Sequence, residues 1–284
     1  MVIVRCVRSD NESFIIGQGA WRIISKGLTG IDYPSVSVYS EKNGIGDGAL
    51  STGKRIDDRE IKIVARTTNP ANNALVRKAT IAFFNPKYSY KLYITYQGVT
   101  RWIGAEIESF SCPSQNVHRN MELTLKFYCA DPYLKSTDDF GQNIASTTPL
   151  LAFPYIECMD PVIHTVSDYF NFNQQAEVHN DGDVQTYARA VIEFAGNVTN
   201  PRVYKNEYYV RVLGTFVEGD RVEIDFEDCT ITKNGTNIIQ YVDRTSAFTN
   251  MDLNIGDSLM GFDADDGDAY MDVYLYYNKR YLGI

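Results

Sequence analysis

Hydrophobic and polar residues alternate most strictly over residues 121–129, where every second side chain is apolar. The apolar positions are Met121, Leu123, Leu125, Phe127 and Cys129. A period of two is typical of a strand with one buried and one exposed face. Asp131-Pro132 follows at once, and proline has no N–H for a sheet and holds the preceding residue in extended geometry. The pattern therefore predicts the closing strand of one domain and the exit to a second.

A chain of 284 residues is long enough for about two domains. We expect an N-terminal domain over residues 1–135 and a C-terminal domain over residues 136–284, with the linker and first strands of the second domain at about 136–176. In the first domain the same pattern predicts strands at residues 2–7, 13–16, 36–39, 59–66, 90–96 and 99–108. Trp21, Ile23, Val36 and Val38 are expected in its core.

One helix is predicted, over residues 70–84. Asn69 is a good N-cap, and Pro70 stands at the first helical position, where its missing N–H costs nothing. An apolar stripe follows at helical spacing and predicts the buried face. Its members are Leu75, Ala79, Ala82 and Phe83.

A glycine-rich stretch, residues 40–54, lies between two predicted strands of the first domain. Glycine permits a mobile or sharply bent backbone. One interpretation is an ordinary exposed hairpin loop; the other is an arm that reaches a neighbouring subunit, because long loops in compact domains tend to be functional. The candidate interface residues are Asn43, Gly44, Gly46, Asp47 and Gly48.

The second half predicts an all-β domain, a sandwich or jelly roll. Short strands are expected at residues 187–194, 207–213, 221–226, 229–233, 237–241, 258–262 and 270–277, with turn residues between them. Asn234-Gly235 predicts a type I′ hairpin turn, because both turn positions require positive φ. Alternation over 270–277 places Tyr270, Tyr274 and Tyr276 on the outward face. We expect this tyrosine row to be a subunit interface, with glycan recognition as the alternative.

The net charge of −9 argues against a general nucleic-acid-binding protein, which has a basic footprint. It is compatible with a surface that DNA passes without binding. The five cysteines and three histidines show no metal-ligand spacing, and we expect no catalytic residues, no metal and no cofactor. The acidic run at residues 263–268 fails the EF-hand register. The run of apolar residues at the N-terminus is too short for a signal peptide or a membrane span, so membrane insertion is not expected.

Several ordered motifs resemble the distal tail (Dit) proteins of long-tailed, non-contractile bacteriophages. In the first half these are the glycine-rich stretch, residues 54–63, the capped helix and residues 128–133. In the second half they are residues 180–183, 200–201, 219–220, 224–225, 234–235, 255–257 and 276–283. The long, proline-containing linker departs from the family pattern.

The resemblance implies a mainly β protein, with an N-terminal ring-forming domain that carries one α-helix and a C-terminal galectin-like β-sandwich. It implies a structural, non-enzymatic baseplate protein of the virion, at the distal end of the tail, assembled in the bacterial cytoplasm. The ring, typically a hexamer, would join the tail tube protein to the tail-tip hub protein. The glycine-rich arm would link neighbours, and the C-terminal domain would contact receptor-binding or other baseplate proteins.

A function of a different class stays open. A β-sandwich with outward tyrosines is also compatible with a carbohydrate-binding adhesin that recognises the host cell surface. A glycoside hydrolase built on a carboxylate pair is a third hypothesis. Among 36 acidic residues some pair is always present, so the presence of a pair does not support it.

Overall fold

The computed structural model describes residues 2–44, 46–113, 119–137, 140–143, 146–149, 170–173 and 175–284. The chain forms two compact units, residues 1–137 with 280–284, and residues 138–279. The expected second domain was continuous to residue 284, whereas the last five residues lie in the first unit. They do so because β26 pairs with β10 and the backbone of Ile284 bonds to that of Ile31 at 3.1 Å.

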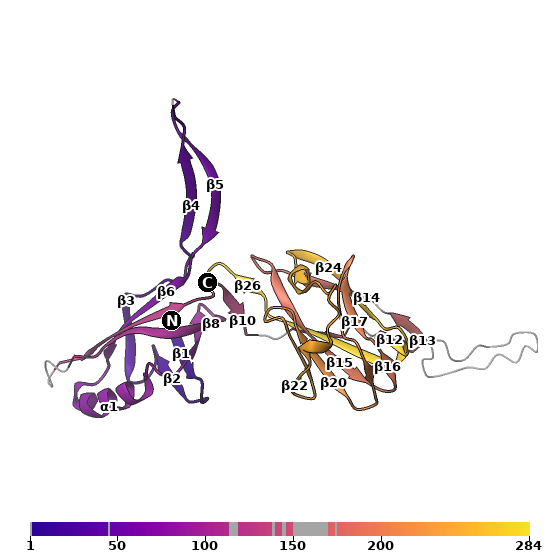
Figure 1. Cartoon of the computed structure of the whole chain (residues 1–284). Coiled ribbons are helices and arrows are strands. Elements are labelled where there is room, and N and C mark those ends of the chain that lie inside the picture. The colour runs from indigo at the N-terminus through magenta and orange to yellow at the C-terminus, as the bar shows by residue number, and fades with distance from the viewer. Residues whose placement is uncertain are drawn as a thin grey trace, which may run out of the picture. The chain divides into compact units, whose positions relative to one another are not determined.

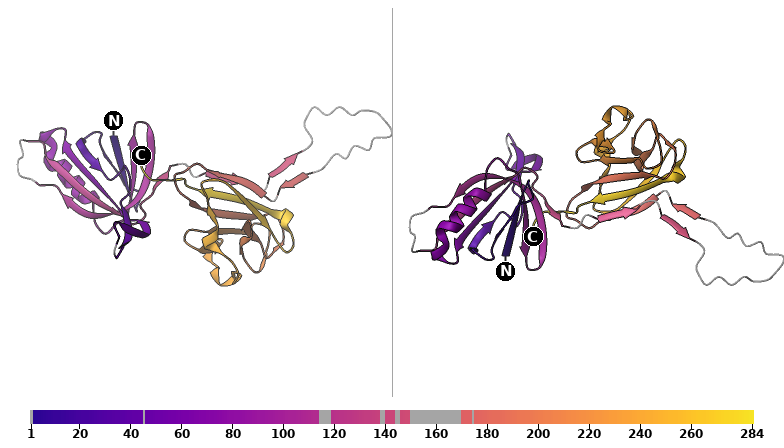
Figure 2. Two further views of the ribbon diagram at one scale, coloured as in Figure 1. Left: turned by 90° about the horizontal axis from the view of Figure 1, so that it is seen from above. Right: turned by 90° about the horizontal axis from the view of Figure 1, so that it is seen from below.

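The first unit is a curled sheet with one helix along its side (Figures 1 and 2). Its elements are β1 (Val2–Arg8), β2 (Ser13–Ile16), β3 (Trp21–Thr29), β4 (Val36–Lys42), β5 (Ala49–Ile56), β6 (Arg59–Thr67), η1 (Pro70–Asn72), α1 (Asn73–Phe83), β7 (Tyr90–Tyr96), β8 (Val99–Ser111), β9 (Glu122–Cys129), β10 (Leu134–Ser136) and β26 (Arg280–Tyr281). The main strand order is β2-β1-β7-β8-β9-β6-β3.

Strand β8 holds this sheet together because it is long enough to pair twice. Its first half pairs with β7 and its second half with β9, with a register shift at residues 107–109. The predicted alternation of residues 121–129 is confirmed, since the apolar side chains of β9 are buried in the core. Trp21 is fully buried there, and its indole N–H donates to the Thr80 hydroxyl at 3.0 Å.

The second unit has two main sheets that enclose one core. Its elements are β11 (Phe140–Asn143), β12 (Ser146–Pro149), β13 (Phe170–Asn173), β14 (Gln175–Asn180), β15 (Thr186–Phe194), β16 (Val198–Thr199), β17 (Arg202–Lys205), β18 (Tyr208–Arg211), β19 (Thr215–Phe216), β20 (Arg221–Asp225), β21 (Thr230–Lys233), β22 (Thr236–Asn237), η2 (Ile239–Tyr241), η3 (Phe248–Asn250), β23 (Asp252–Leu253), β24 (Gly256–Asp263), η4 (Asp268–Tyr270) and β25 (Met271–Tyr277). One sheet has the order β11-β25-β15-β20-β21-β22 and the other β14-β24-β17-β18.

The buried side chains of both sheets belong to a single hydrophobic cluster, so the unit is a β-sandwich. The mainly β fold with one α-helix is therefore confirmed. Asn234 and Gly235 have φ values of 49° and 80°, as the predicted type I′ turn requires. The strand expected at residues 237–241 is wrong: β22 ends at Asn237, and the 3₁₀ turn η2 follows. The Asn237 side chain accepts a hydrogen bond from the N–H of Ile239 at 2.9 Å and turns the chain there.

Candidate interaction surfaces

The most prominent surface feature of the first unit is the arm, the hairpin of β4 and β5. Its strands pair with each other and with no other strand in the described part of the chain. At its root the Asp57 N–H donates to the Ser35 carbonyl oxygen at 2.9 Å, and the Ser37 hydroxyl donates to the Asp57 carboxylate at 2.6 Å. Figure 1 shows the arm projecting away from the sheet. The root is therefore fixed, while no described strand of the same unit pairs with the hairpin itself.

The tip of the arm brings together the glycine-rich candidate residues. The Asn43 N–H donates to the Gly48 carbonyl oxygen at 3.4 Å, and Gly48 has a φ of 90°. Asp47 lies in the same turn, where its carbonyl oxygen accepts from the Asn43 side chain at 3.5 Å. All three residues are exposed. Among the described tip residues, 43, 44 and 46–48, the side chains are polar or absent, so these residues offer backbone groups and no apolar anchor.

Apolar anchors lie instead along the arm. Val36 and Val38 were expected in the core, and this is wrong: they are 39% and 63% exposed. The reason is that β4 leaves the sheet at its root and pairs only with β5. Tyr39 and Leu50 are exposed as well. The arm thus carries four large apolar side chains in water, which is typical of a surface that a partner covers.

The predicted buried face of the helix is wrong at three of its four members, and only Phe83 is buried as expected. Leu75 is 74% exposed, and Ala79 and Ala82 are exposed. The face that packs on the sheet carries Asn73 and Thr80, because both find buried partners. The Thr67 hydroxyl donates to the Asn73 side chain at 2.9 Å, and Thr80 binds Trp21 and the helix backbone.

The predicted cap at Asn69 is confirmed, because its side chain accepts from the Ala71 N–H at 3.0 Å, but it begins the 3₁₀ turn η1. The α-helix itself begins three residues later than predicted, at Asn73, without a side-chain cap. Two large apolar side chains of α1 are exposed, Leu75 and Ile81.

The predicted tyrosine row holds for two of its three members. Tyr274 and Tyr276 are half-buried on the outward face of β25, opposite the buried side chains of the same strand. Tyr270 lies before the strand, in η4, where its ring packs against the Gly196 backbone. The pKa of Tyr274 is raised by partial burial and by the nearby Asp272 carboxylate. The row is therefore shorter than expected and lies beside negative charge.

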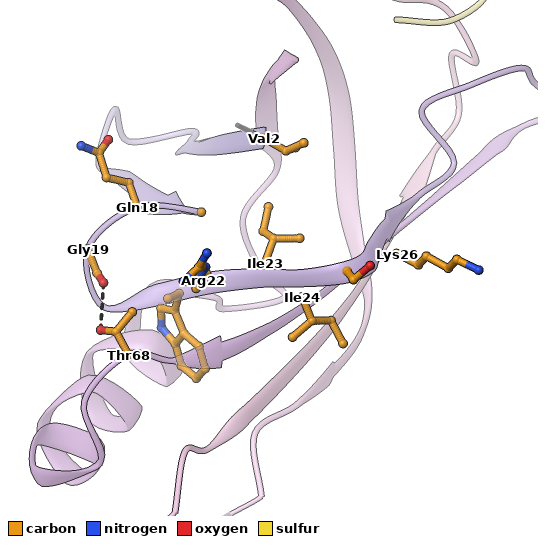
Figure 3. Close-up of a pocket in the computed structure, with 11 residues that line it drawn as sticks. Val2, Gln18, Gly19, Arg22, Ile23, Ile24, Lys26 and Thr68 are labelled. Atoms are coloured by element: carbon orange, nitrogen blue, oxygen red, sulfur yellow. Dashed lines mark hydrogen bonds between the residues drawn. The ribbon is translucent and has the colours of Figure 1, made fainter. Parts of the chain in front are cut away.

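A hollow of roughly 670 Å³ lies beside the edge strand β3 (Figure 3). It is lined by the turn that contains Gly17 and Gly19, which have φ values of 106° and 76°. The pairing of β3 with β6 is broken between Ile23 and Leu28. The Thr68 hydroxyl donates to the Gly19 carbonyl oxygen at 3.0 Å and closes one end of the hollow. Its lining contains no carboxylate, histidine or cysteine.

Titratable groups do not converge on a reaction centre within the described residues, and no cluster of metal-ligand residues occurs there. His179 is exposed and lies 2.5 Å from Asp257, while His118 and His164 fall outside the described residues. In the acidic run, Asp263 and Asp265 form ion pairs with arginines of neighbouring strands. None of the described helices is long and apolar enough to cross a membrane.

The comparisons with known proteins separate into a family match and fold matches. Residues 181–281 match the family model of the siphovirus-type tail component, C-terminal domain. The crystal structure of the SPP1 Dit protein, described as a paradigm of the hub adsorption apparatus in phages that infect Gram-positive bacteria, is similar over 98% of this chain and 99% of its own. The TM-score is 0.69 at 12% identity.

Chains of the phage P2 baseplate are similar as well. The activated baseplate with Ca gives a TM-score of 0.58 at 10% identity and covers all of both chains. The activated baseplate with Sr gives 0.54 at 11% identity, over 97% of this chain and 98% of that one. No curated protein matches the sequence. The resemblance noted in the sequence is thus confirmed, by the family model in the C-terminal half and by fold along the whole chain.

Proposed function

We propose that copies of this chain form a ring in the tail tip. The premise is that residues 181–281 belong to the siphovirus-type tail component family and that the whole chain has the Dit fold. The chain is a structural component of a phage tail. In the proposal its first units pack side by side into a closed ring, a hexamer as the resemblance implies. The ring joins the tail tube to the tail-tip hub and performs no catalysis.

The arm is the observation that carries this proposal. A two-stranded hairpin is marginally stable in water unless a third strand or a packed surface supports it. Among the described residues of its own unit the arm has neither, and Val38 and Leu50 on it are 63% and 64% exposed. A neighbouring copy supplies the missing surface if the subunits follow each other around a ring, because such a head-to-tail contact can close on itself.

The second unit has a separate role in the proposal. It docks receptor-binding or other baseplate proteins. The half-buried Tyr274 and Tyr276 support an interface, because tyrosine is enriched where proteins meet. The assembled ring belongs to the virion, at the distal end of the tail, after assembly in the host cytoplasm.

The arm is tested with the double variant Val38→Ser and Leu50→Ser. Burial of one such side chain stabilises by about 1.5–3 kcal/mol, so losing two weakens each contact by about 3–6 kcal/mol, or more than a hundredfold in Kd. We expect light scattering after size exclusion to give a multiple of 32.1 kDa for the native protein and a mass near 32.1 kDa for the variant.

The matched control is Leu213→Ser with Val217→Ser, two exposed apolar side chains of the second unit. This control should keep the native mass, and negative-stain microscopy should still show ring-shaped particles. A native protein that stays monomeric at every accessible concentration contradicts the ring. A ring that survives the arm variant contradicts the role of the arm.

The carbohydrate-binding alternative has weaker support. The Arg189 guanidinium lies 5.4 Å from the centre of the Tyr276 ring, so that ring face is already in contact with a side chain. A sugar stacks on an open aromatic face. A glycan-binding assay with Tyr274→Ala and Tyr276→Ala separates the two functions, since specific binding that both substitutions abolish favours the adhesin.

A further inference from the structure

The charge of the chain is divided unequally between its two units. The first unit has 19 Lys and Arg against 12 Asp and Glu, a formal charge of +7. The second has 8 against 24, a formal charge of −16, and together they give the −9 of the whole chain. The negative net charge of the whole chain therefore does not support an acidic channel, because the unit proposed to form the ring is basic. Net charge therefore favours a contact between the first unit of one copy and the second unit of another, in addition to the packing of first units through the arm.

Part of the positive charge gathers in a row of side chains, the ladder, on the outward face of the first sheet. The ladder consists of Arg5, Lys91, Tyr93, Trp102 and Lys135. Arg5 lies opposite Tyr93 on the next strand, Tyr93 opposite Trp102, and Trp102 opposite Lys135, so the row crosses β1, β7, β8 and β10. The alternate residues of these strands point into the core, which fixes the ladder on the outside.

Aromatic rings hold the ladder cations in place. The Arg5 guanidinium lies 4.6 Å from the centre of the Tyr93 ring. The Lys91 and Lys135 ammonium groups lie 4.9 and 5.5 Å from the centre of the Trp102 ring. Arg5 and Lys91 are exposed, and within the described residues neither forms an ion pair. The two cations are therefore pre-positioned and available to an anion.

The chemistry of the ladder favours a protein partner. Nucleobases and sugars bind aromatic platforms through open ring faces, and here cations already lie over both rings. The Trp102 indole N–H is also used, because it donates to the Ser136 carbonyl oxygen at 2.8 Å. Trp, Tyr and Arg together are the composition of interface hot spots. The ladder thus fits an acidic protein surface with aromatic or apolar surroundings.

The second unit carries such a surface on its larger sheet. Glu193 of β15 lies directly opposite Asp272 of β25, and both side chains are exposed. Like charges in that position destabilise a sheet unless a cation approaches them. Arg221 is the other neighbour of Glu193, but its guanidinium binds Glu223 at 2.9 Å. Tyr274 follows Asp272 on the same face, so the acid pair lies beside the tyrosine row.

We propose that the ladder of one copy docks on the Glu193–Asp272 acid pair and tyrosine row of a second copy. The contact joins two different surfaces, and every copy carries both, so it can continue from copy to copy until it closes. The inference rests on the proposed ring and refines it: the tyrosine row faces a neighbouring copy, and receptor-binding or other baseplate proteins dock elsewhere on the second unit. It adds an electrostatic contact that is independent of the arm.

The test reverses each side of the contact separately. The ladder variant is Arg5→Glu with Lys91→Glu, and the acid-pair variant is Glu193→Lys with Asp272→Lys. A charge control, Lys78→Glu with Lys87→Glu, changes two exposed cations of the first unit outside the ladder by the same amount. Association is measured by sedimentation velocity at about 50 mM and about 500 mM salt, since salt screens exposed charges. Circular dichroism checks that each variant is folded.

We expect each reversed variant alone to associate at least about tenfold more weakly than the native protein at low salt. The charge control should differ by less than about threefold. An equal mixture of the two reversed variants should recover native association, because each negative ladder then meets a positive pair and each native ladder meets a native pair. A single chain with all four substitutions should recover it too.

Reversed variants that associate like the native protein overturn the proposal, as does a mixture that recovers nothing. Both results leave the ring intact if negative-stain microscopy still shows it in the native protein and the arm variant still dissociates it. The absence of any native ring refutes the proposed function instead. The two failures are therefore distinguishable.

Discussion

Arg59 is a buried cation that ties together three distant segments of the first unit. It is 2% exposed, and its guanidinium donates to three backbone carbonyl oxygens from distant parts of the chain. The acceptors are Pro132 at 2.7 Å, Gly30 at 3.0 Å and Leu282 at 2.6 Å. Burial lowers the pKa of Arg59, but an arginine stays charged in the folded protein. One cation thus binds the turn after β3, the exit from β9 and the returning C-terminal segment.

Arg59→Met keeps much of the side-chain volume and removes all three hydrogen bonds. A buried carbonyl left without a partner costs about 1–3 kcal/mol, and the Leu282 carbonyl can recover water if the C-terminal segment detaches. Loss of the other two predicts a fall of about 2–6 kcal/mol in the free energy of unfolding. Arg59→Lys should recover little, because an ammonium group cannot present the planar fork of donors.

Tryptophan fluorescence in urea measures this unit selectively, because Trp21 and Trp102 both belong to it. With a slope of about 2 kcal/mol per molar urea, the midpoint should fall by about 1–3 M. The control is Arg66→Met, which removes an exposed ion pair to Glu122 at 3.0 Å and should cost less than about 1 kcal/mol. An Arg59→Met midpoint equal to that of the control refutes the reasoning.

Three further predictions concern the core and the second unit. Lys205→Met leaves Asp252 without the ammonium 3.0 Å away and should destabilise the second unit by about 2–3 kcal/mol in calorimetry, whereas Lys233→Met, at a more exposed pair, should cost less. Hydrogen bonds from Lys279 and Lys233 lower the pKa of Asp181 and Asp220, so the stability they contribute is present above the ordinary aspartate pKa and lost as pH falls below it. The calorimetric transition of the second unit, which tryptophan fluorescence does not report, should therefore move to lower temperature between about pH 5 and pH 3. A transition temperature that does not change over this range contradicts the prediction. Burial raises the pKa of the Cys6 thiol, and it raises the pKa of the Cys129 thiol to about 12. In a Cys158→Ser background, a thiol reagent at pH 8 should therefore label the exposed Cys229 first. Cys6 and Cys129 should react only when the protein unfolds.

Local patterns in the sequence determined the strands and their turns. The alternation of residues 121–129 and the Asn234-Gly235 turn depend on neighbours in sequence, and both were predictable. The Gln97-Gly98 hairpin, with φ values of 49° and 90°, is of the same kind. The division of charge was also readable from the sequence, once the boundary between the units was placed.

The tertiary structure alone decided which faces are buried. The helix buries Asn73 and Thr80 and exposes Leu75, because hydrogen-bond partners from distant strands remove the cost of burying polar groups. Val38 reads as a core residue but lies on the arm, because a strand is buried only if another element covers it. The ladder depends on register across β1, β7, β8 and β10, which no single stretch of sequence contains. Periodicity specifies that a strand or helix has an apolar side; contacts between distant segments specify what that side meets.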